Sequence, residues 1–243
     1  MVVVSVSEQG LKRTTMEDYI YPDVGRYEVT KFPYLFAVAD GVAGNPFGEK
    51  ASRAAIELLV SYYDFFVNKK KIPPSKSMLK SIFDSIQEGL EFIEHIDKTV
   101  RGSATTLSVG IVTHDAFIYG YAGDSPIYLF RKKSYKRLDS PHIIGKWYLY
   151  MGTPLLNQSL VNCMGGYSGS SSLYKGATVG QIPIMKGDYL FIASDGVTLH
   201  MSPSEIRDLL FSSKTIEEVS DIITDVVYQK GAMDNFSFVV VEV

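Results

Sequence analysis

The chain contains 243 residues, 46% of them hydrophobic, and its 24 basic and 27 acidic side chains give a formal net charge of −3. The basic residues do not form a block, which argues against a nucleic-acid partner. Cys163 is the single cysteine, so an internal disulfide and a thiolate metal cluster are excluded. The sequence has neither a signal peptide nor an apolar run of roughly 18 residues, the minimum for a membrane span. We therefore expect residues 1–243 to form one soluble cytoplasmic domain, a monomer without membrane or nucleic-acid partners.

The N-terminal part of the chain combines short strands with a group of charges. Residues 2–6 and 19–21 are predicted to be strands, and the loop between them carries Arg13 and the adjacent acids Glu17 and Asp18. Adjacent carboxylates repel each other and are usually solvated, so an exposed loop is the simplest interpretation. A bound cation would offset the same repulsion, so a metal site is the functional alternative.

The next predicted strand ends at an Asp-Gly pair. Residues 34–39 are an apolar run typical of a buried strand, and Asp40 and Gly41 follow it directly. Asp-Gly is a common turn pair, but a carboxylate fixed at a strand end is also well placed to bind a metal. The pattern recurs at residues 189–197, where an apolar strand leads into a second Asp-Gly pair at Asp195. The repetition favours a metal-binding function over two unrelated turns.

Two pairs of helices and a series of antiparallel strands make up most of the remaining chain. Ser202 and Thr215 each begin a capping box, which marks the start of a helix. Asp124 lies in a tight turn between two strands, where it either caps the turn or faces a metal, and Asp234 lies at the start of the last strand. The predicted helices cover residues 49–68, 77–95, 203–210 and 216–230, and the predicted strands cover 104–112, 116–122, 126–130, 178–184 and 236–241.

Between residues 140 and 176 neither a helical nor a strand period is sustained. Such irregular segments are either loops over a functional site or insertions. Outside this segment, the order is strands, a helix pair, strands, a helix pair and a final strand. This order predicts an α+β fold with four layers, αββα, in which two packed antiparallel β-sheets are flanked by helix pairs.

Carboxylates at the margins of buried strands, without a cluster of His and Cys, are typical of a site for hard cations. Mg²⁺ and Mn²⁺ prefer oxygen ligands and retain several waters, so few protein ligands are needed. Two such ions can activate a water and neutralise a phosphoryl group, and Arg13 offers planar donors that match a phosphate. A Walker loop and a Gly-x-Ser-x-Gly elbow are both absent from the sequence. The residues alone therefore indicate a metal-dependent hydrolase.

Six motifs, in order, resemble the motif set of the metal-dependent protein phosphatases, the type 2C serine/threonine phosphatases. They are Arg-Thr-Thr-Met-Glu-Asp at 13–18, Phe-Ala-Val-Ala-Asp-Gly at 36–41, Gly-Ser-Ala-Thr-Thr-Leu at 102–107, Ala-Gly-Asp-Ser at 122–125, Gly-Asp-Tyr-Leu-Phe-Ile-Ala-Ser-Asp-Gly at 187–196 and Asp-Asn at 234–235. The resemblance extends over residues 5–243. It implies a β-sandwich with helix pairs outside and a site for two Mn²⁺ or Mg²⁺ ions at one edge.

The resemblance also implies a role for each matching residue. Asp40 would bridge the two ions, the Gly41 carbonyl would bind one of them, and Asp195 and Asp234 would complete the other. A water held by Asp40 and the metals would attack the phosphorus of phosphoserine or phosphothreonine, with no phosphoenzyme intermediate.

The second group of matching residues lies around the implied metals. Glu17 and Asp18 would hold metal-bound waters, and Arg13 would bind the substrate phosphate. The implied substrates are phosphorylated proteins, made by a serine/threonine kinase.

The chain departs from the family pattern at three places. Leu199 stands where many members have an aspartate that helps the residue matching Asp124 to hold a third ion, so third-ion binding is in doubt. Val42 stands where animal members have a histidine proposed as general acid, so no protein general acid is identified. Residues 140–176 correspond in position to the family's substrate-facing flap, but their sequence resembles that flap poorly.

Two alternatives remain beside the phosphatase interpretation. A catalytically silent member of the same fold could serve as a regulatory module that binds phosphoproteins, and Leu199 is the one feature that favours it. A phosphatase with an aspartyl nucleophile would need Asp-x-Asp at a strand end, and Asp40 is followed by Gly-Val-Ala instead.

Overall fold

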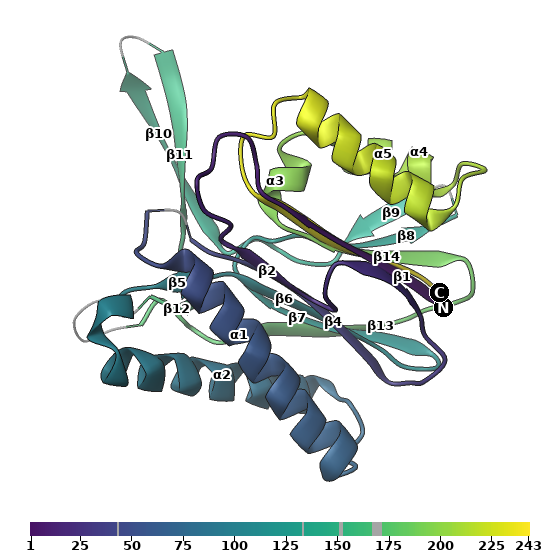
Figure 1. Cartoon of the computed structure of the whole chain (residues 1–243), viewed down its shortest axis with the longest axis horizontal. Coiled ribbons are helices and arrows are strands. Elements are labelled where there is room, and N and C mark those ends of the chain that lie inside the picture. Colours follow the sequence, from purple (N-terminus) through teal and green to yellow (C-terminus); the bar gives the residue numbers. More distant parts are fainter. Residues whose placement is uncertain (43, 133, 151–152, 167–171) are drawn as a thin grey trace.

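Two antiparallel sheets packed face to face form the centre of the computed structural model (Figure 1). The structure describes residues 1–42, 44–132, 134–150, 153–166 and 172–243, and for residues 146–150 and 153–158 it describes the backbone alone. The first sheet has six strands, in the order β3 (Gly25–Glu28), β1 (Val2–Glu8), β15 (Phe236–Glu242), β14 (Asp188–Ala193), β8 (Ile127–Arg131) and β9 (Ser134–Arg137). The second has five, in the order β13 (Thr178–Pro183), β7 (Ala116–Ala122), β6 (Leu107–Val112), β4 (Tyr34–Asp40) and β2 (Asp18–Tyr21).

A helix layer covers the outer face of each sheet. The helices α1 (Gly48–Tyr63) and α2 (Lys76–Ile96) lie on the five-stranded sheet, and α4 (Pro203–Leu210) and α5 (Ile216–Gln229) lie on the six-stranded one (Figure 1). Three further helical segments are short. The π-helix η1 (Asp64–Lys69) extends α1, the 3₁₀ turn η2 (Lys98–Val100) follows α2, and α3 (Asp195–Thr198) follows β14. The αββα prediction is therefore confirmed.

The capping boxes predicted for α4 and α5 are both formed. The Ser202 hydroxyl accepts a hydrogen bond from the backbone N–H of Glu205, whose carboxylate accepts one from the N–H of Ser202 in return. Thr215 and Glu218 repeat the arrangement at the start of α5. Each box satisfies N–H groups that the first helical turn leaves without a partner.

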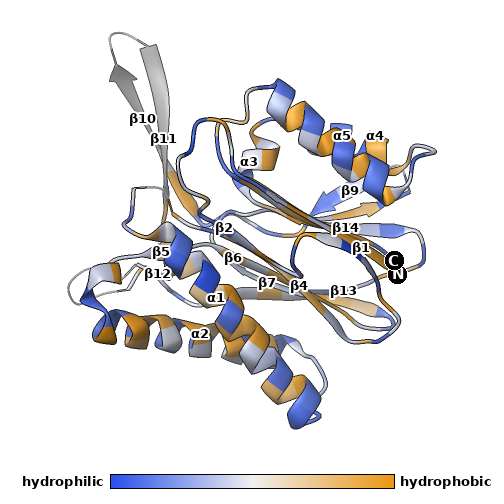
Figure 2. Cartoon of the chain, viewed as in Figure 1, coloured by the Kyte–Doolittle hydropathy of each residue, from blue (hydrophilic) through white to orange (hydrophobic). Residues whose placement is uncertain are grey.

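Three hydrophobic layers hold the four structural layers together. One lies between α1, α2 and the five-stranded sheet, one between α4, α5 and the six-stranded sheet, and one between the two sheets. Figure 2 shows hydrophobic residues along the central strands and alternating hydrophobic and hydrophilic residues on the helices. In the layer between the sheets, Phe36 of β4 stacks on Phe117 of β7 with ring centroids 5.7 Å apart. Both rings lie on the inner face of the five-stranded sheet, in the same hydrophobic layer as Leu190 and Val239 of the six-stranded sheet.

The segment 140–176 contains regular structure, so the prediction of an irregular stretch was wrong. Strands β10 (Ile143–Tyr150) and β11 (Thr153–Leu160) form an antiparallel hairpin that projects from the body (Figure 1). Nearer the body, β12 (Met164–Gly165) pairs with β5 (Ala104–Thr105). The sequence of these strands shows no sustained period of two, so periodicity did not reveal them. Residues 151–152 and 167–171 of this segment lie outside the described residues.

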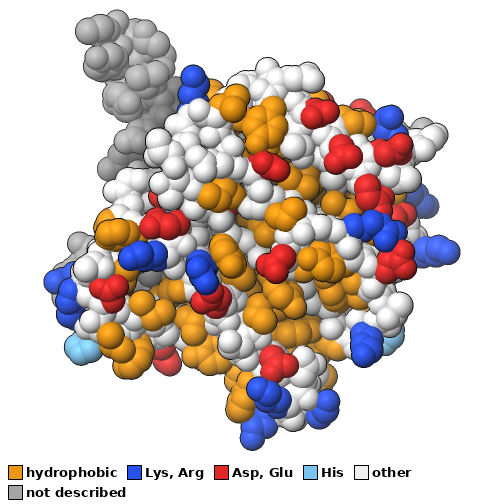
Figure 3. All heavy atoms as spheres, in the orientation of Figure 1, with side chains coloured by type: hydrophobic (Ala, Val, Ile, Leu, Met, Phe, Trp, Pro, Cys, Tyr) orange, Lys and Arg blue, Asp and Glu red, His pale blue; other side chains and the backbone are white. Residues whose placement is uncertain are grey.

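Two edge strands, β3 and β9, were also not predicted. Both lie at the margins of the six-stranded sheet, and every side chain of β9 is exposed. A strand without buried side chains lacks the apolar alternation on which the prediction depends. No helix in the described part of the chain is both long enough and apolar enough to cross a membrane. On the face that Figure 3 shows, acidic and basic side chains are interspersed.

Candidate active site

The alternation of β4 directs Asp40 into the space between the sheets. Leu35 and Ala37 pack toward α1 and α2, whereas Phe36 and Val38 pack toward the other sheet. Because successive side chains of a strand point to opposite faces, Asp40 shares the inner face with Phe36 and Val38. It is the last residue of the strand. The Asp40 carboxylate therefore lies at the edge of the hydrophobic layer between the sheets.

Asp18 of β2 is a second carboxylate on the same inner face. It lies opposite Asp40 in the antiparallel register of β2 and β4 and is 3% exposed. The Ser194 hydroxyl, which comes from the other sheet, donates a hydrogen bond of 2.7 Å to its Oδ2. Its Oδ1 is buried without a hydrogen-bond partner among the described groups. Asp18 thus connects the two sheets and leaves one acceptor atom unused.

The backbone at the end of β4 is held firmly. The Asp40 N–H donates to Thr106 Oγ1 at 3.0 Å, and the Thr106 N–H donates to the Asp40 carbonyl at 2.8 Å. The next residue, Gly41, donates its N–H to the Glu17 carbonyl at 3.1 Å. A Cβ at Gly41 would lie 2.6 Å from the carbonyl carbon of Gly48, a contact no side chain tolerates. Glycine is therefore required here for the approach of α1 and the Glu17 loop.

The six-stranded sheet supplies two further carboxylates. Asp195 follows β14 as the first residue of α3, and Asp234 lies just before β15, the partner strand of β14. A Cβ at Gly196 would meet the Asn235 carbonyl oxygen at 2.0 Å, so the two segments touch without intervening side chains. The Asn235 N–H donates to Asp234 Oδ1 at 2.8 Å. Pairing of neighbouring strands therefore brings together two acids that are far apart in the sequence.

Arg13 lies between the acids. Its Nη2 donates to Asp234 Oδ2 at 2.6 Å, and its Nη1 is 3.6 Å from Glu17 Oε2. The side chains of Arg13 and Asp234 are 31% and 26% exposed, so both are reachable from outside. In this structure the guanidinium that the sequence assigned to a substrate phosphate is paired with a carboxylate.

These residues line one cavity of about 420 Å³. Among those with a role assigned from the sequence, the cavity contacts Arg13, Asp40, Gly41, Asp124, Asp195 and Asp234. Glu17 and Asp18 adjoin it through their contacts with Arg13 and Asp40. Residues without an assigned role also line it, namely Val42, Asn45, Thr106, Ile143, Ser159, Leu160 and Leu173. Thr106 lies within a quoted motif, but the hairpin and loop residues gave no sequence signal.

The hairpin is rooted next to Asp124. The His142 N–H donates to the Gly123 carbonyl at 3.0 Å, and the Gly123 N–H donates to His142 Nδ1 at 3.2 Å. Burial lowers the pKa of His142, which favours the neutral ring that this acceptor role requires. On the return strand, the Val161 N–H donates to the His142 carbonyl at 2.9 Å. One end of the hairpin is therefore attached directly to the turn that carries Asp124, and the other end is attached to it through His142.

Crowding of acids raises several pKa values in the cavity. Burial, followed by the charges of Asp18, Asp195, Asp234 and Asp124, raises the pKa of Asp40 well above its ordinary value. Burial and neighbouring acids raise the pKa of Asp195 to about 7. Burial is also the main cause that raises the pKa of Asp18 to about 6. Without a cation, the cavity thus disfavours its own carboxylates in the charged form.

The donor set fits hard divalent cations. A 2+ ion would offset the mutual repulsion of these carboxylates, and the buried Asp18 Oδ1 is an acceptor that a metal-bound water could satisfy. Among the described side chains, no three His, Cys, Asp or Glu groups converge closely enough to hold an ion unaided. Mg²⁺ and Mn²⁺ retain several waters and also accept carbonyl ligands such as that of Gly41, so they do not require such a cluster.

The comparisons with known proteins agree with this geometry. The family model described as protein phosphatase 2C matches residues 17–230. The protein phosphatase PhpP of Streptococcus pneumoniae is 26% identical, over 99% of this chain and 97% of the relative.

Two solved structures share the fold. One is the serine/threonine phosphatase Stp1 from Staphylococcus aureus, with a TM-score of 0.78, 19% identity and coverage of 99% of this chain and 94% of that one. The other is the catalytic domain of PstP, a serine/threonine protein phosphatase known from Mycobacterium tuberculosis, in complex with two manganese ions. It has a TM-score of 0.74, 19% identity and coverage of 100% and 99%. Because the family model covers most of the chain, this protein is a member of the protein phosphatase 2C family.

Proposed function

We propose that this protein removes phosphate from phosphoserine and phosphothreonine side chains of other proteins, in a reaction that depends on two Mn²⁺ or Mg²⁺ ions. One observation carries the proposal: four aspartates and one arginine from five separate segments line a single cavity in a member of this phosphatase family. The named relatives are protein phosphatases, and PstP has been solved with two manganese ions.

In this proposal the aspartates hold the ions. Asp40 would bind both ions, with the Gly41 carbonyl beside it, and Asp195 and Asp234 would complete the set. When bound, such ions lower the pKa of a coordinated water and neutralise charge on a phosphoryl group. Ser194 keeps Asp18 in place through its hydrogen bond, so that Asp18 can accept from water in the cavity.

Arg13 would bind the substrate phosphate. Its guanidinium is partly exposed at the cavity and is held by Asp234 and Glu17. A planar donor set matches two phosphate oxygens at once. Binding of phosphate would draw the guanidinium away from Asp234, which would then be available to a metal. Arg13 thus couples arrival of the substrate to release of a metal-binding carboxylate.

No histidine lines the described part of the cavity, and Val42 has no proton to donate. We therefore assign protonation of the leaving serine or threonine oxygen to solvent. Asp124 lies in the cavity, but Leu199 replaces the acid that would share a third ion with it, so we propose two ions and not three.

We also propose that residues 1–243 form one catalytic domain that acts as a cytoplasmic monomer on proteins phosphorylated by a serine/threonine kinase. Coverage of PstP and of this chain is nearly complete in both directions, which supports the single domain. A silent binding module is not favoured, because Asp40, Asp124, Asp195 and Asp234 all line the cavity.

The test is phosphate release from paired phosphothreonine and phosphotyrosine peptides of otherwise identical sequence. We expect release from the phosphothreonine peptide with Mn²⁺, loss of that release with EDTA, and recovery when excess Mn²⁺ is added. Tight binding of the phosphothreonine peptide without any release would instead establish the silent module.

A further inference from the structure

Three large hydrophobic side chains are exposed beside the acidic cavity. Leu11, Leu199 and Met233, which we call the apolar rim, are 65%, 62% and 64% exposed. A single exposed hydrophobic side chain needs no explanation. Three of them on the segments around one cavity form a surface that a ligand could cover with a gain in free energy.

Backbone hydrogen bonds bring the three segments of the rim together. The Leu11 N–H donates to the Ala232 carbonyl at 2.8 Å, which places Leu11 next to the Met233 segment. The Met233 N–H donates to His200 Nε2 at 3.2 Å, which places Met233 next to the residue that follows Leu199. The three segments of the rim therefore adjoin one another, although its members are up to 222 positions apart in the sequence.

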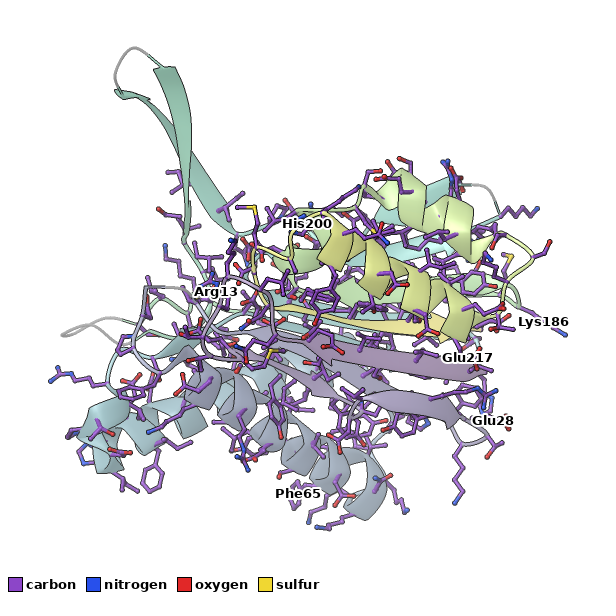
Figure 4. The ribbon with its side chains drawn as sticks, turned by 45° about the horizontal axis from the view of Figure 1, so that its top comes forward. Arg13, Glu28, Phe65, Lys186, His200 and Glu217 are labelled. Atoms are coloured by element: carbon purple, nitrogen blue, oxygen red, sulfur yellow. The ribbon has the colours of Figure 1, made fainter. Side chains whose placement is uncertain are left out.

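Each segment of the rim also supplies a cavity residue. Leu11 lies two positions before Arg13, and Met233 directly precedes Asp234, to which Arg13 is paired at 2.6 Å. The Leu199 N–H donates to the carbonyl of Asp195 at 2.8 Å, so these two residues share one face of a helical turn. The rim residues thus lie on the segments that carry Arg13, Asp195 and Asp234 into the cavity. Figure 4 shows Arg13 on the side of the molecule near the hairpin and Lys186 at the opposite end, with His200 between them.

We propose that the apolar rim binds a hydrophobic side chain of the substrate, a few residues away from the phosphoserine or phosphothreonine that enters the cavity. This inference rests on the proposed function. An extended peptide advances by about 3.3 Å per residue, so neighbours of a phosphoresidue fixed in the cavity reach its margin within a few positions. The rim carries no charge, and so it selects apolar over polar neighbours.

The rim also provides selectivity that the cavity lacks. Every phosphoserine or phosphothreonine presents the same phosphate to Arg13 and the acids, so these groups cannot distinguish one substrate protein from another. Burial of apolar area against the rim differs between substrates and enters kcat/KM directly. Leu199 therefore contributes to substrate selection, in addition to replacing the acid that would hold a third ion.

The experiment compares two phosphothreonine peptides that differ only in their flanking residues, leucine in one and serine in the other. With Mn²⁺ present, we expect wild-type protein to favour the leucine peptide by about tenfold in kcat/KM. The variants Met233→Gln and Leu199→Gln should each reduce this ratio to about twofold. Because the ratio compares two peptides on one enzyme, a change in metal affinity cancels.

Met185→Gln is the matched control. Met185 is 50% exposed and lies in the turn before β14, next to Lys186, which Figure 4 shows at the end of the molecule away from Arg13. It should leave the ratio at the wild-type value. Equal ratios for all four proteins, or an equal loss in the control, would overturn the proposal.

Two further outcomes are separable. Release from neither peptide and none from p-nitrophenyl phosphate would reject the proposed function itself. A wild-type dimer in sedimentation that Met233→Gln converts to a monomer, with no peptide preference, would assign the rim to a second copy of the chain and reject the substrate role.

Discussion

Asp18 on β2 lies directly opposite Asp40 on β4, and both carboxylates face the other sheet. Like charges at opposed positions in a sheet destabilise it. Burial, followed by the charge of Asp18, raises the pKa of Asp40, and burial raises the pKa of Asp18. A divalent cation bound beside this pair would offset the repulsion between the two carboxylates.

The stability of the metal-free protein should therefore fall as pH rises. The pKa of Asp18 is raised from 3.8 to about 6 and that of Asp195 to about 7, so the folded state binds these protons more tightly than the unfolded chain does. The contribution of these two groups to the free energy of unfolding is complete below their pKa values in the unfolded chain. It is lost as pH rises through their pKa values in the folded protein. Urea unfolding in EDTA should show a lower free energy of unfolding at about pH 8 than at about pH 5, and Mn²⁺ should stabilise more at the higher pH.

Asp18→Asn should flatten this pH dependence, whereas Asp221→Asn, a change at an exposed position of α5, should leave it intact. An unchanged slope in Asp18→Asn would show that the slope comes from other groups.

Asp40→Asn should abolish phosphatase activity. The amide carries no charge and cannot bind two ions as a carboxylate does, so we expect a loss of at least about 100-fold in kcat. Calorimetry should show weakened Mn²⁺ binding in the same variant. Asp115→Asn, in an exposed turn between β6 and β7, is the control. Full activity in Asp40→Asn would contradict the proposed metal site.

Arg13→Lys should raise KM for a phosphopeptide more than it lowers kcat. Lysine keeps the charge but loses the planar pair of donors, so kcat/KM should fall by about tenfold. Arg53→Lys removes an exposed guanidinium that pairs with Glu57 on α1 and should have no effect. An equal KM in Arg13→Lys and wild type would place the phosphate elsewhere.

Gly41→Ala should destabilise the protein by about 1–3 kcal/mol, because the added methyl group would overlap the backbone of Gly48. Gly89→Ala is a useful contrast. Its Cβ would meet the end of the Leu58 side chain, which can move, and alanine favours the α2 helix. Chemical denaturation of the two variants should therefore separate backbone overlap from the general effect of adding a methyl group.

The sequence allowed most of the core to be predicted, because buried strands and helices carry strong periodic patterns. The apolar run before Asp40 and the capping box at Ser202 are examples, and both elements are found where they were expected. What could not be predicted lies where burial imposes no pattern. The β10–β11 hairpin projects from the body, and every side chain of β9 is exposed.

The candidate site shows the same division. The positions of Asp40 and Asp195 at strand ends are local properties and could be inferred from the sequence. The contact between Asp18 and Ser194 joins residues 176 positions apart and depends on how the two sheets pack. The pairing of Arg13 with Asp234 likewise follows from tertiary structure. Metal ligation and the number of ions stay predictions.

Because the hairpin is attached beside Asp124, a small rotation at its root corresponds to a large displacement of its far end. Each of its strands has eight residues, which corresponds to an arm of roughly 27 Å at 3.4 Å per residue. A tilt of roughly 10° at the root would move the far end by roughly 5 Å. Conversely, a large displacement of the far end by a docked protein would reach the Gly123–Asp124 turn as a small rotation. A displacement of the far end of the hairpin by a docked partner would therefore be transmitted to a carboxylate of the cavity at a reduced amplitude.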